Sequence, residues 1–581
     1  MSAKREQESR TSDPRKHTNS HESSLVLFRV FSGSIVFALS VTNIRLMPPK
    51  LNRREFVTTA LAASAIAAAA PQSFSQSTSR RPNVLFILAD DLGYGDLSCY
   101  GRPDYQTPHL DRLAREGVRF ANAYSASPLC TPTRCAFITG RYPARTEVGL
   151  QEPLHERRAM GDKALTLGLP PEHPTIASML KQSGYETALI GKWHLGYLPN
   201  FGPLQSGFEE FFGIMSGAAD FFTHKDMVGD LDLYEGKVHV ERIGYMTDML
   251  TERAVDYIRR RGEVRTGSGN DRVSTSNTAK GTSNRKESKR PFYLSLHYTA
   301  PHWPWEAASD RPPVPELRGP VQFRSGGSLK TYALMMKSLD DGIGRVLETL
   351  AHAGLERDTL VIFTSDNGGE RFSYHWPFTG QKNSLWEGGI RVPAIVRWPG
   401  VTSKVQSPRS KVEGQASNNL ILGPRASRSL LSEPGELAPG AQVVLPAGGR
   451  IIHRPAITMD WTATILAAAG VKPDPAYPLD GINLAPMVNP RISPPHSSMA
   501  PPPPPSTAPR TFFWRNANQD AALRGMWKYL NDGTREYLFN LTIDEREQAD
   551  FRAQYPEVFN QLKSAFKAWE ATILPRPPAR S

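Results

Sequence analysis

Continuously apolar runs recur along the chain and predict buried strands. The segment 83–88, NVLFIL, is a continuous apolar run after Asn83 and ends just before an acidic pair, which is typical of a strand covered on both faces of a parallel sheet. The segments 291–298, PFYLSLHY, and 359–366, TLVIFTSD, have the same character. We therefore expect three buried strands at these places.

Between these runs, apolar residues return every three or four positions. This spacing predicts helices over 109–124, 175–183, 331–354 and 456–470. Gly184 should end the second helix, and the run 187–191 predicts a strand directly after it. Strands that alternate with helices indicate an α/β fold with a large, mostly parallel mixed sheet flanked by helices.

Three stretches interrupt this alternation. The segments near 262–290, 402–448 and 489–509 are rich in Ser, Gly, Pro or Lys, and we interpret them as insertions without a packed core. The main domain is expected over 81–470, with the first two insertions inside it. Residues 471–581 predict a small C-terminal α+β domain, because two short strands, a turn and a terminal helix follow the proline-rich insertion.

The N-terminal region has the features of an export signal. Arg53 and Arg54 precede a mild Ala-rich apolar run, a pattern that resembles a bacterial twin-arginine signal over 47–80. The alternative is an ordinary Ala-rich helix. Residues 1–46 are an extension of uncertain role, either upstream of the true start or, through the apolar stretch 24–42, a weak anchor. We expect a bacterial protein exported to the periplasm or the extracellular space.

Charge and cysteine content narrow the function classes. The net charge is +12, but residues 1–80 hold eleven Lys/Arg against five Asp/Glu, and residues 259–290 hold ten against three. The remainder is about neutral, so we expect no nucleic-acid partner. The three cysteines, Cys99, Cys130 and Cys135, are too few for a disulfide framework. We assign Cys99 and Cys135 to the core.

Two of the predicted strands end in acidic side chains. Asp90 and Asp91 follow the first strand, and Asp366 and Asn367 end the third. The carboxyl ends of parallel strands border the crevice in which ligands of α/β sheets bind. Three carboxylates and an amide oxygen that meet there need a cation, and such hard ligands suit Ca²⁺, with Mg²⁺ as the alternative. Each pair on its own would also fit a helix or turn cap.

The segment 125–141, SASPLCTPTRCAFITGR, places a cysteine where a helix is expected to begin. Cys130 and Arg134 are four residues apart, so a helix that begins at Cys130 presents both on one face. The free N–H groups of a helix N-terminus and an Arg fork together form an anion site. These residues predict a nucleophile beside an anion-binding cradle, with a buried structural cysteine as the alternative.

Four further basic residues are candidates for the same site. Lys192 and His194 in GKWH are two positions apart and share a face if the strand continues. His302 follows a strand in APHWP, and Lys382 lies on the Gly-bounded loop 379–393. Each alone is weak evidence, because a single Lys is commonly a solvated charge and a single His a hydrogen-bonded structural residue.

Taken together, the motifs resemble those of the type I sulfatases. The resemblance is carried by RPNVLFILADDLGYGDLSCYG, Cys-x-Pro-x-Arg, GKWHLG, APHWP, TSDNGG and GQKNSLWEGGIRVP, in the family's order. It runs from about Arg81 to the terminal helix and omits the three insertions. It implies an alkaline-phosphatase-like fold, a catalytic domain over 81–470, and the hydrolysis of sulfate monoesters.

The resemblance also implies two chemical groups. Cys130 would be oxidised to formylglycine by a formylglycine-generating enzyme or sulfatase maturase, and the hydrated aldehyde, a gem-diol, would be the nucleophile. Calcium would be held by Asp90, Asp91, Asp366 and Asn367. The twin-arginine export machinery carries folded proteins, which fits a modification made beforehand in the cytoplasm.

The basic residues receive roles from the same resemblance. Arg134 and Lys192 would stabilise the diol and the anion. His194 would accept the proton of the second hydroxyl. Lys382 and His302 would contact the sulfate and protonate the leaving alcohol.

Two other classes of function stay open at this point: a phosphate- or phosphonate-ester hydrolase of the wider superfamily, and a glycan-binding protein without activity. The substrate itself is expected to be a sulfated carbohydrate, because GFEEFFGIMSGAADFFTHKD, within 196–245, resembles arylsulfatase-like and N-acetylgalactosamine-6-sulfatase-like members. Asp220 and His224 in this segment either line the pocket or belong to a solvated loop.

Overall fold

The computed structural model describes residues 81–153, 166–266, 290–310, 324–399, 449–488 and 509–577. The predicted export signal, the N-terminal extension, the insertion 402–448 and most of the other two insertions lie outside these described residues. Among the helices within them, none is both long enough and apolar enough to cross a membrane.

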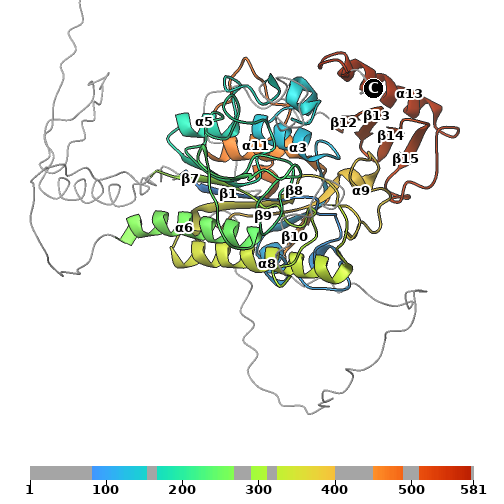
Figure 1. Ribbon diagram of the computed structural model, residues 1–581. Helices are drawn as coiled ribbons and strands as arrows, with labels where there is room; N and C mark the ends of the chain where they lie inside the picture. Colours follow the sequence, from blue (N-terminus) through green and yellow to red (C-terminus); the bar gives the residue numbers. More distant parts are fainter. Residues whose placement is uncertain are drawn as a thin grey trace, which may run out of the picture. The chain divides into compact units, whose positions relative to one another are not determined.

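An eleven-stranded sheet forms the centre of the larger part of the described chain (Figure 1). Its strands are β1 (Asn83–Ala89), β2 (Val118–Tyr124), β3 (Glu186–Gly191), β4 (Glu210–Ile214), β5 (Leu233–Glu235), β6 (Val238–His239), β7 (Phe292–His297), β8 (Thr359–Ser365), β9 (Arg391–Arg397), β10 (Arg450–Ile452) and β11 (Ala456–Ile457). The order is β10-β2-β9-β8-β1-β7-β3-β4-β5-β6, with β11 beside β2. The run from β8 to β4 is parallel, whereas β9, β5 and β6 are antiparallel to their neighbours. The sheet is therefore mixed and mostly parallel, as predicted.

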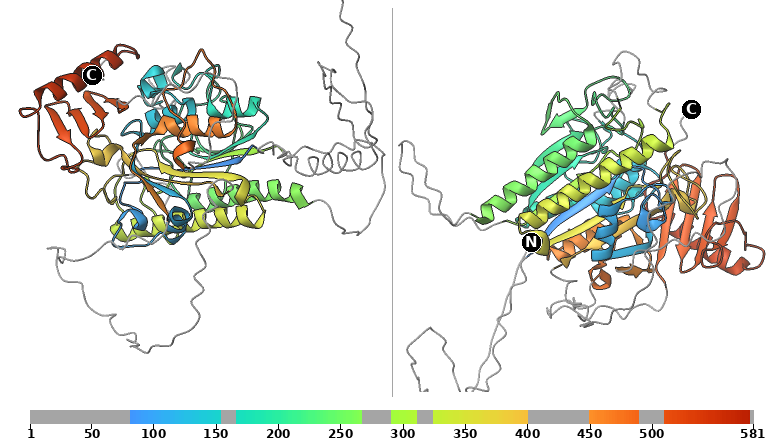
Figure 2. Two further views of the ribbon diagram at one scale, coloured as in Figure 1. Left: turned by 180° about the vertical axis from the view of Figure 1, so that it is seen from behind. Right: turned by 90° about the horizontal axis from the view of Figure 1, so that it is seen from below.

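Helices cover both faces of this sheet (Figure 1, Figure 2). One face carries α2 (Pro108–Glu116), α6 (Met246–Thr266) and α8 (Leu329–His352), and the other carries α3 (Cys130–Thr139), α5 (Ile176–Gln182) and α11 (Thr458–Ala468). Successive side chains of β1 point to opposite faces of the sheet. Leu85 and Ile87 pack in the core with α6 and α8, and Phe86 packs against Phe137 of α3. A strand buried on both faces is apolar at nearly every position, which explains the run VLFIL after Asn83.

One predicted helix is wrong in its second half. The segment 109–124 contains all of α2 except its first residue, and all of β2, not a single helix. Gly117 separates them, and a Cβ at this position would lie 2.3 Å from the carbonyl oxygen of Val396. The close approach brings β2 alongside β9, where Val118 and Phe120 are paired. Their pairing and burial outweigh the helical spacing that Val118 shares with α2.

The C-terminal part holds a second sheet of four antiparallel strands and a terminal helix. These are β12 (Thr511–Asn516), β13 (Gln519–Arg524), β14 (Trp527–Asn531), β15 (Glu536–Asn540) and α13 (Pro556–Glu570). The sequence predicted only two strands, because the first of the four begins directly after the proline-rich insertion. One face of the sheet packs on α13, and the other contacts the large sheet, where the rings of Trp514 and Tyr124 lie 5.4 Å apart.

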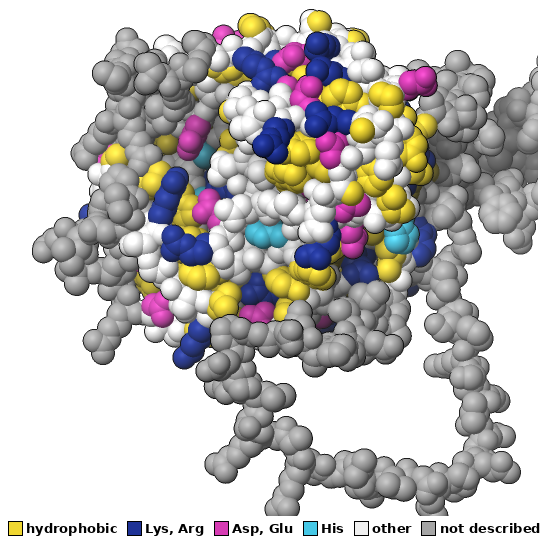
Figure 3. All heavy atoms as spheres, turned by 90° about the vertical axis from the view of Figure 1, so that its right-hand side faces the viewer, with side chains coloured by type: hydrophobic (Ala, Val, Ile, Leu, Met, Phe, Trp, Pro, Cys, Tyr) yellow, Lys and Arg dark blue, Asp and Glu magenta, His cyan; other side chains and the backbone are white. Residues whose placement is uncertain are grey.

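The side that carries this second sheet is shown in Figure 3. Lys and Arg side chains alternate there with Asp and Glu side chains and with apolar ones. The described residues on this side therefore present mixed charge, not a continuous basic stripe.

Candidate active site

The acidic pairs come together because their strands are neighbours. β1 and β8 are parallel, and Ala89 lies opposite Ser365 at their ends. The next residues of both strands therefore leave the sheet side by side at its carboxyl edge. Asp90, Asp91, Asp366 and Asn367 are all at most 3% exposed, and Asp366 Oδ1 accepts a hydrogen bond of 3.1 Å from the backbone N–H of Asp91.

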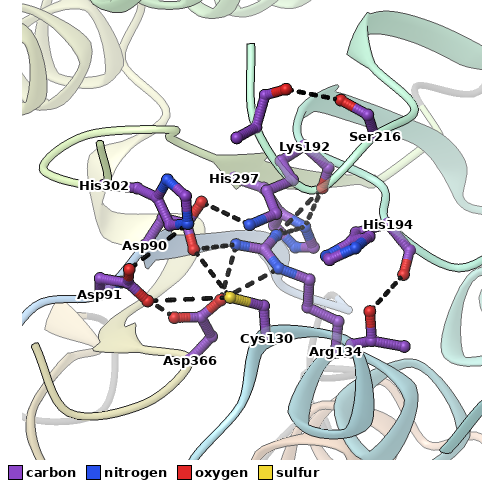
Figure 4. A network of polar contacts seen from close by, with 12 residues as sticks. Asp90, Asp91, Cys130, Arg134, Lys192, His194, Ser216, His297, His302 and Asp366 are labelled. Carbon is purple, nitrogen blue, oxygen red and sulfur yellow. Dashed lines mark hydrogen bonds and ion pairs between the residues drawn. The ribbon is translucent and has the colours of Figure 1, made fainter. Parts of the chain in front are cut away.

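The helix α3 begins at Cys130, as predicted, and directs this cysteine at the acidic pairs (Figure 4). Cys130 Sγ lies 3.5 Å from Asp90 Oδ1 and 3.7 Å from Asp91 Oδ1. The side chain is 5% exposed. The residue that motif analysis singled out as a nucleophile thus lies in contact with two of the predicted metal ligands.

Arg134 lies one helical turn after Cys130 and is fully buried. Its Nη2 is 2.9 Å from Asp366 Oδ2 and 3.3 Å from Asp90 Oδ1. It also donates from Nη1 to the carbonyl oxygen of Lys192 at 3.1 Å. A planar fork reaches several partners at once, so this arginine joins the ends of β1, β8 and β3.

Two lysines complete the positive side of the cluster. Lys192 Nζ lies 2.7 Å from Asp90 Oδ2, and Lys382 Nζ lies 2.6 Å from Asp91 Oδ2. Both lysines are buried, and Lys382 also lies 3.5 Å from Glu370. Lys192, just after β3, therefore contacts Asp90, and Lys382, on the loop 379–393, contacts the neighbouring Asp91.

The two predicted histidines approach the cluster from different loops. His302 Nε2 lies 3.4 Å from Asp91 Oδ2, and its Nδ1 lies 2.5 Å from the carbonyl oxygen of Trp303. His194 does not share a strand face with Lys192, which corrects the sequence analysis. β3 ends at Gly191, and His194 has a φ of 56° and donates its N–H to the carbonyl oxygen of Met215.

Two site residues escaped the sequence analysis. His297, the last residue of β7, is buried beside Arg134, with 3.4 Å between its Nδ1 and Arg134 Nη1. Its strand position was readable, but nothing in its motif distinguished it from a core histidine. Glu152 Oε1 lies 3.1 Å from His194 Nε2, and no motif surrounds it, so the sequence offered no signal for this contact.

The remaining residues named in the sequence analysis make contacts that belong to the fold. Asp220 and His224 are both buried, which corrects the solvated-loop alternative. Asp220 accepts hydrogen bonds from two backbone N–H groups of its own turn, and His224 Nε2 lies 3.1 Å from the carbonyl oxygen of Gly244. Cys99 and Cys135 are buried in the two cores that flank the sheet, as expected.

The buried charges push the pKa values of the carboxyl groups apart. Burial alone would raise the pKa of Asp90, but the positive charges of Lys192 and Arg134 hold it well below its usual value. Burial and the negative charge of Asp90 raise the pKa of Asp366 to about 7. Three carboxyl groups this close repel one another when all are ionised. Full ionisation is favoured only when further positive charge is added beside them.

The donor set fits a hard divalent cation. Asp90 and Asp91 belong to a group whose ligand atoms, with those of Cys130 and His302, lie within 4.8 Å of one another. Asn367 Oδ1 is buried and has no hydrogen-bond partner among the described residues. Carboxylate and amide oxygens are the ligands that Ca²⁺ prefers. The four predicted ligands therefore have the chemistry that such an ion requires.

The same environment disfavours Cys130 as a thiolate nucleophile. Burial raises the pKa of its thiol well above the ordinary value, despite the nearby charges of Lys192 and Lys382. Burial opposes charge on Lys192 and Lys382 as well, but the carboxylates raise the pKa of both. The cluster thus offers fixed positive charge for an anion beside a cysteine that is a poor thiolate.

Comparison with known proteins points to one family. The chain matches the family profile "Sulfatase" over residues 82–471. It is 29% identical over 444 residues to N-acetylgalactosamine-6-sulfatase of Rattus norvegicus, which covers 72% of this chain and 67% of the relative. It is 27% identical over 555 residues to arylsulfatase J of Mus musculus, which covers 87% of this chain and 78% of the relative.

Solved structures agree with this assignment. The structure of Ps i-CgsB in complex with k-i-k-neocarrahexaose superposes with a TM-score of 0.61 at 26% identity, covering 84% of this chain and 93% of that one. The PsFucS1 sulfatase from Pseudoalteromonas sp. has a TM-score of 0.56 at 23% identity, covering 90% and 95%, and supports the fold. The chain therefore belongs to the sulfatase family and is a sulfuric ester hydrolase.

Proposed function

We propose that this sulfatase cleaves sulfate monoesters of carbohydrates, with Cys130 as the precursor of its nucleophile. The observation that carries the proposal is the placement of Cys130 Sγ within 3.7 Å of Asp90 and Asp91, two carboxylates that Arg134, Lys192 and Lys382 contact. A sulfate ester is already an anion, so attack at its sulfur requires a site with this excess of positive side chains.

The nucleophile comes from a modified side chain. Oxidation of Cys130 by a maturation enzyme to formylglycine would supply a hydrated aldehyde. One of its hydroxyls would attack sulfur and lose its proton to Asp366, as the S–O bond to the alcohol breaks. The other would later lose its proton to His194 and form C=O, as the C–O bond to sulfate breaks. A sulfate ester of serine or cysteine has only one heteroatom on its Cβ, so it cannot release sulfate by forming C=O. The high pKa of the Cys130 thiol supports a role other than thiolate attack.

Calcium, held by Asp90, Asp91, Asp366 and Asn367, would supply positive charge at the sulfate oxygens. Arg134 and Lys192 bind the anion from the α3 and β3 sides, and their buried positions exclude water from it. Lys382 contacts the sulfate from the opposite side. These side chains are in place before substrate arrives, so the reaction needs little rearrangement of charge.

His302 donates the proton to the leaving alcohol, assisted by Lys382. Burial lowers the pKa of the His302 ring well below its usual value. Both ring nitrogens nevertheless face oxygen acceptors, on Trp303 and Asp91. A negative sulfate beside the ring favours its charged form, so the acid is generated where it is needed. His194 takes the proton from the second hydroxyl at Nδ1.

A carbohydrate substrate is supported by two relatives. N-acetylgalactosamine-6-sulfatase is named for an amino sugar sulfate, and Ps i-CgsB was solved with an oligosaccharide. Steryl-sulfatase of Mus musculus is 34% identical over 55% of this chain and 58% of its own length. Sterol sulfates are therefore a comparison class for the substrate test.

The test is a screen for sulfate release. The matured protein is incubated with sulfated mono- and disaccharides, a steryl sulfate, an aryl sulfate and an aryl phosphate, and Cys130→Ala is the matched control. The proposal expects release from at least one sulfated saccharide, faster than hydrolysis of the aryl phosphate, and none with Cys130→Ala. Preference for the steryl sulfate or the phosphate would contradict the carbohydrate assignment, and full turnover by Cys130→Ala would contradict the nucleophile.

We also propose export through the twin-arginine route, supported by Arg53, Arg54 and the apolar run after them. Replacing both arginines by lysine should retain the protein in the cytoplasm of a bacterial host, whereas the parent chain should be found in the periplasm or outside the cell. Equal distribution of the two chains would rule this route out.

A further inference from the structure

A carboxylate outside every motif contacts the buried histidine of the site. Glu152 Oε1 lies 3.1 Å from His194 Nε2. The side chain of Glu152 is 53% exposed, whereas that of His194 is 5% exposed. The carboxylate therefore lies on the solvent side of the ring, and the rest of the ring faces the interior.

The His194 ring is held in place by its neighbours. Its backbone has a φ of 56°, and its carbonyl oxygen accepts a hydrogen bond of 3.2 Å from Thr131 Oγ1, next to Cys130. Gly217 lies against the ring: a Cβ there would be 2.6 Å from His194 Cε1 and 3.3 Å from Glu152 Oε1. The ring of His194 and the carboxylate of Glu152 thus both pack against Gly217.

The ionisation states decide which ring nitrogen carries the proton. Partial desolvation of the half-exposed Glu152 carboxyl group opposes its ionisation, but the hydrogen bond from His194 and the charge of Lys192 lower its pKa to about 2. An ionised carboxylate only accepts hydrogen bonds, so His194 Nε2 must donate. Burial also lowers the pKa of His194, which favours the neutral ring. A neutral ring that donates from Nε2 has its lone pair on Nδ1.

The second nitrogen is available for chemistry. His194 Nδ1 is buried and has no hydrogen-bond partner among the described residues. A buried acceptor without a partner is costly for the folded protein, so such atoms commonly have a function. Figure 4 shows the ring on the side of the cluster that Lys192 and Arg134 occupy.

We propose that Glu152 is a positioning residue that holds the proton of His194 on Nε2 and so leaves Nδ1 as the proton acceptor of the reaction. The inference rests on the proposed function, in which the proton of the second hydroxyl passes to Nδ1 while sulfate leaves with the electrons of the broken C–O bond. Glu152 keeps its negative charge throughout and stabilises the imidazolium that forms.

The first test reads the proton position directly, without turnover. The full chain is labelled with ¹⁵N-histidine, and the His194 signals are assigned by their loss in His194→Gln. We expect a protonated Nε2 and an unprotonated Nδ1 in the parent protein and in Glu152→Gln, whose side-chain oxygen still accepts. Glu152→Ala should show a mixture of both tautomers. A protonated Nδ1 in the parent, or an unchanged ring in Glu152→Ala, overturns the proposal.

The second test separates positioning from substrate binding. With an aryl sulfate, whose alcohol leaves readily, Glu152→Ala should lower kcat and KM together by about 10–100-fold, because only the later proton transfer is slowed. A burst of one equivalent of phenol should then precede slow turnover. Glu152→Gln should lie between Glu152→Ala and the parent, since it keeps the hydrogen bond and loses the charge.

Glu147→Ala is the matched control, because Glu147 is an exposed carboxylate five residues earlier in the same stretch, and its kinetics should equal those of the parent. A raised KM with unchanged kcat in Glu152→Ala would mean that Glu152 binds substrate, and would overturn the proposal. Absence of sulfate release by the parent protein would instead refute the proposed function itself, and this role with it.

Discussion

Arg134 Nη2 lies 2.9 Å from Asp366 Oδ2, and this buried pair joins the second turn of α3 to the residue that follows β8. The two residues are 232 positions apart in the chain. Because Arg134 also reaches Asp90, a single guanidinium fixes Cys130 relative to both acidic strand ends. The pair therefore controls the distance between the nucleophile precursor and the predicted cation ligands.

We predict that Arg134→Lys lowers kcat about 100- to 1,000-fold, because an ammonium cannot reach both carboxylates and the anion as a planar fork does. Arg145→Lys is the matched control. Arg145 makes a two-point pair with Asp480 outside the site, with distances of 2.7 and 2.9 Å, and its kcat should stay near that of the parent. Steady-state kinetics on one sulfate ester would measure kcat for both variants and the parent. An Arg134→Lys enzyme as fast as the control would refute the bridging role of Arg134.

The acidic strand ends should bind calcium. A chelator should abolish activity, and Ca²⁺ should restore more of it than Mg²⁺, since oxygen ligands from rigid strand ends leave little room for the waters that Mg²⁺ keeps. Asp366→Ala should lose both metal content and activity. Asp111→Asn is the control, because Asp111 accepts from the backbone N–H of Cys99 and the hydroxyl of Ser98 and lies outside the site. Elemental analysis that finds calcium retained in Asp366→Ala would place the ion elsewhere.

His302→Ala should affect poor leaving groups most. A sugar alcohol needs a proton as it departs, whereas nitrophenol leaves as an anion. We expect the loss of kcat/KM to be about 100-fold greater for a sulfated sugar than for nitrophenyl sulfate. The comparison is made on one enzyme preparation with both substrates. Equal losses on the two would show that His302 does not act as the acid.

Asp232 provides a pH-dependent prediction. Its carboxylate accepts from the N–H groups of Met215 and Ser216, in the turn that also accepts from His194, and burial raises its pKa to about 7. An acid with a raised pKa binds its proton more tightly when folded, so its contribution to stability is present below about pH 4 and is lost as pH rises to about 7. Three pKa units correspond to at most about 4 kcal/mol of unfolding free energy.

Asp232→Asn removes this titration while keeping an acceptor oxygen. Denaturant unfolding at pH 5 and pH 8 should show the variant gaining stability relative to the parent at the higher pH. Parallel stability curves for the two proteins would show that the carboxyl group does not titrate in this range, and a gain at the lower pH would reverse the sign of its shift.

Much of the site was predictable because its chemistry is local. Asp90 and Asp366 directly follow apolar strands, and parallel strands end at one edge, so their meeting followed from two short patterns. Cys130 and Arg134 share a face because four residues make one helical turn. Glu152 could not be found this way, since its contact with His194 depends on how two loops fold over each other.

The fold was predictable where one strand or helix is long and strongly patterned. β1 and α8 are such elements, and both are confirmed. The helix predicted through Val118 failed because Gly117 permits a close backbone approach that only the pairing with β9 reveals. The first two C-terminal strands were missed because they directly follow the proline-rich insertion, and their packing partner, Tyr124 with its neighbours, is hundreds of residues away.

The central claim is that Cys130 serves as the precursor of an aldehyde and does not act as a thiol. Mass spectrometry of the tryptic peptide 120–134, FANAYSASPLCTPTR, from an active preparation tests this most directly, because Cys130 is its only cysteine. The account predicts the mass of the formylglycine form, in a proportion that follows specific activity across preparations. A fully active preparation whose peptide carries only the unmodified thiol would contradict it.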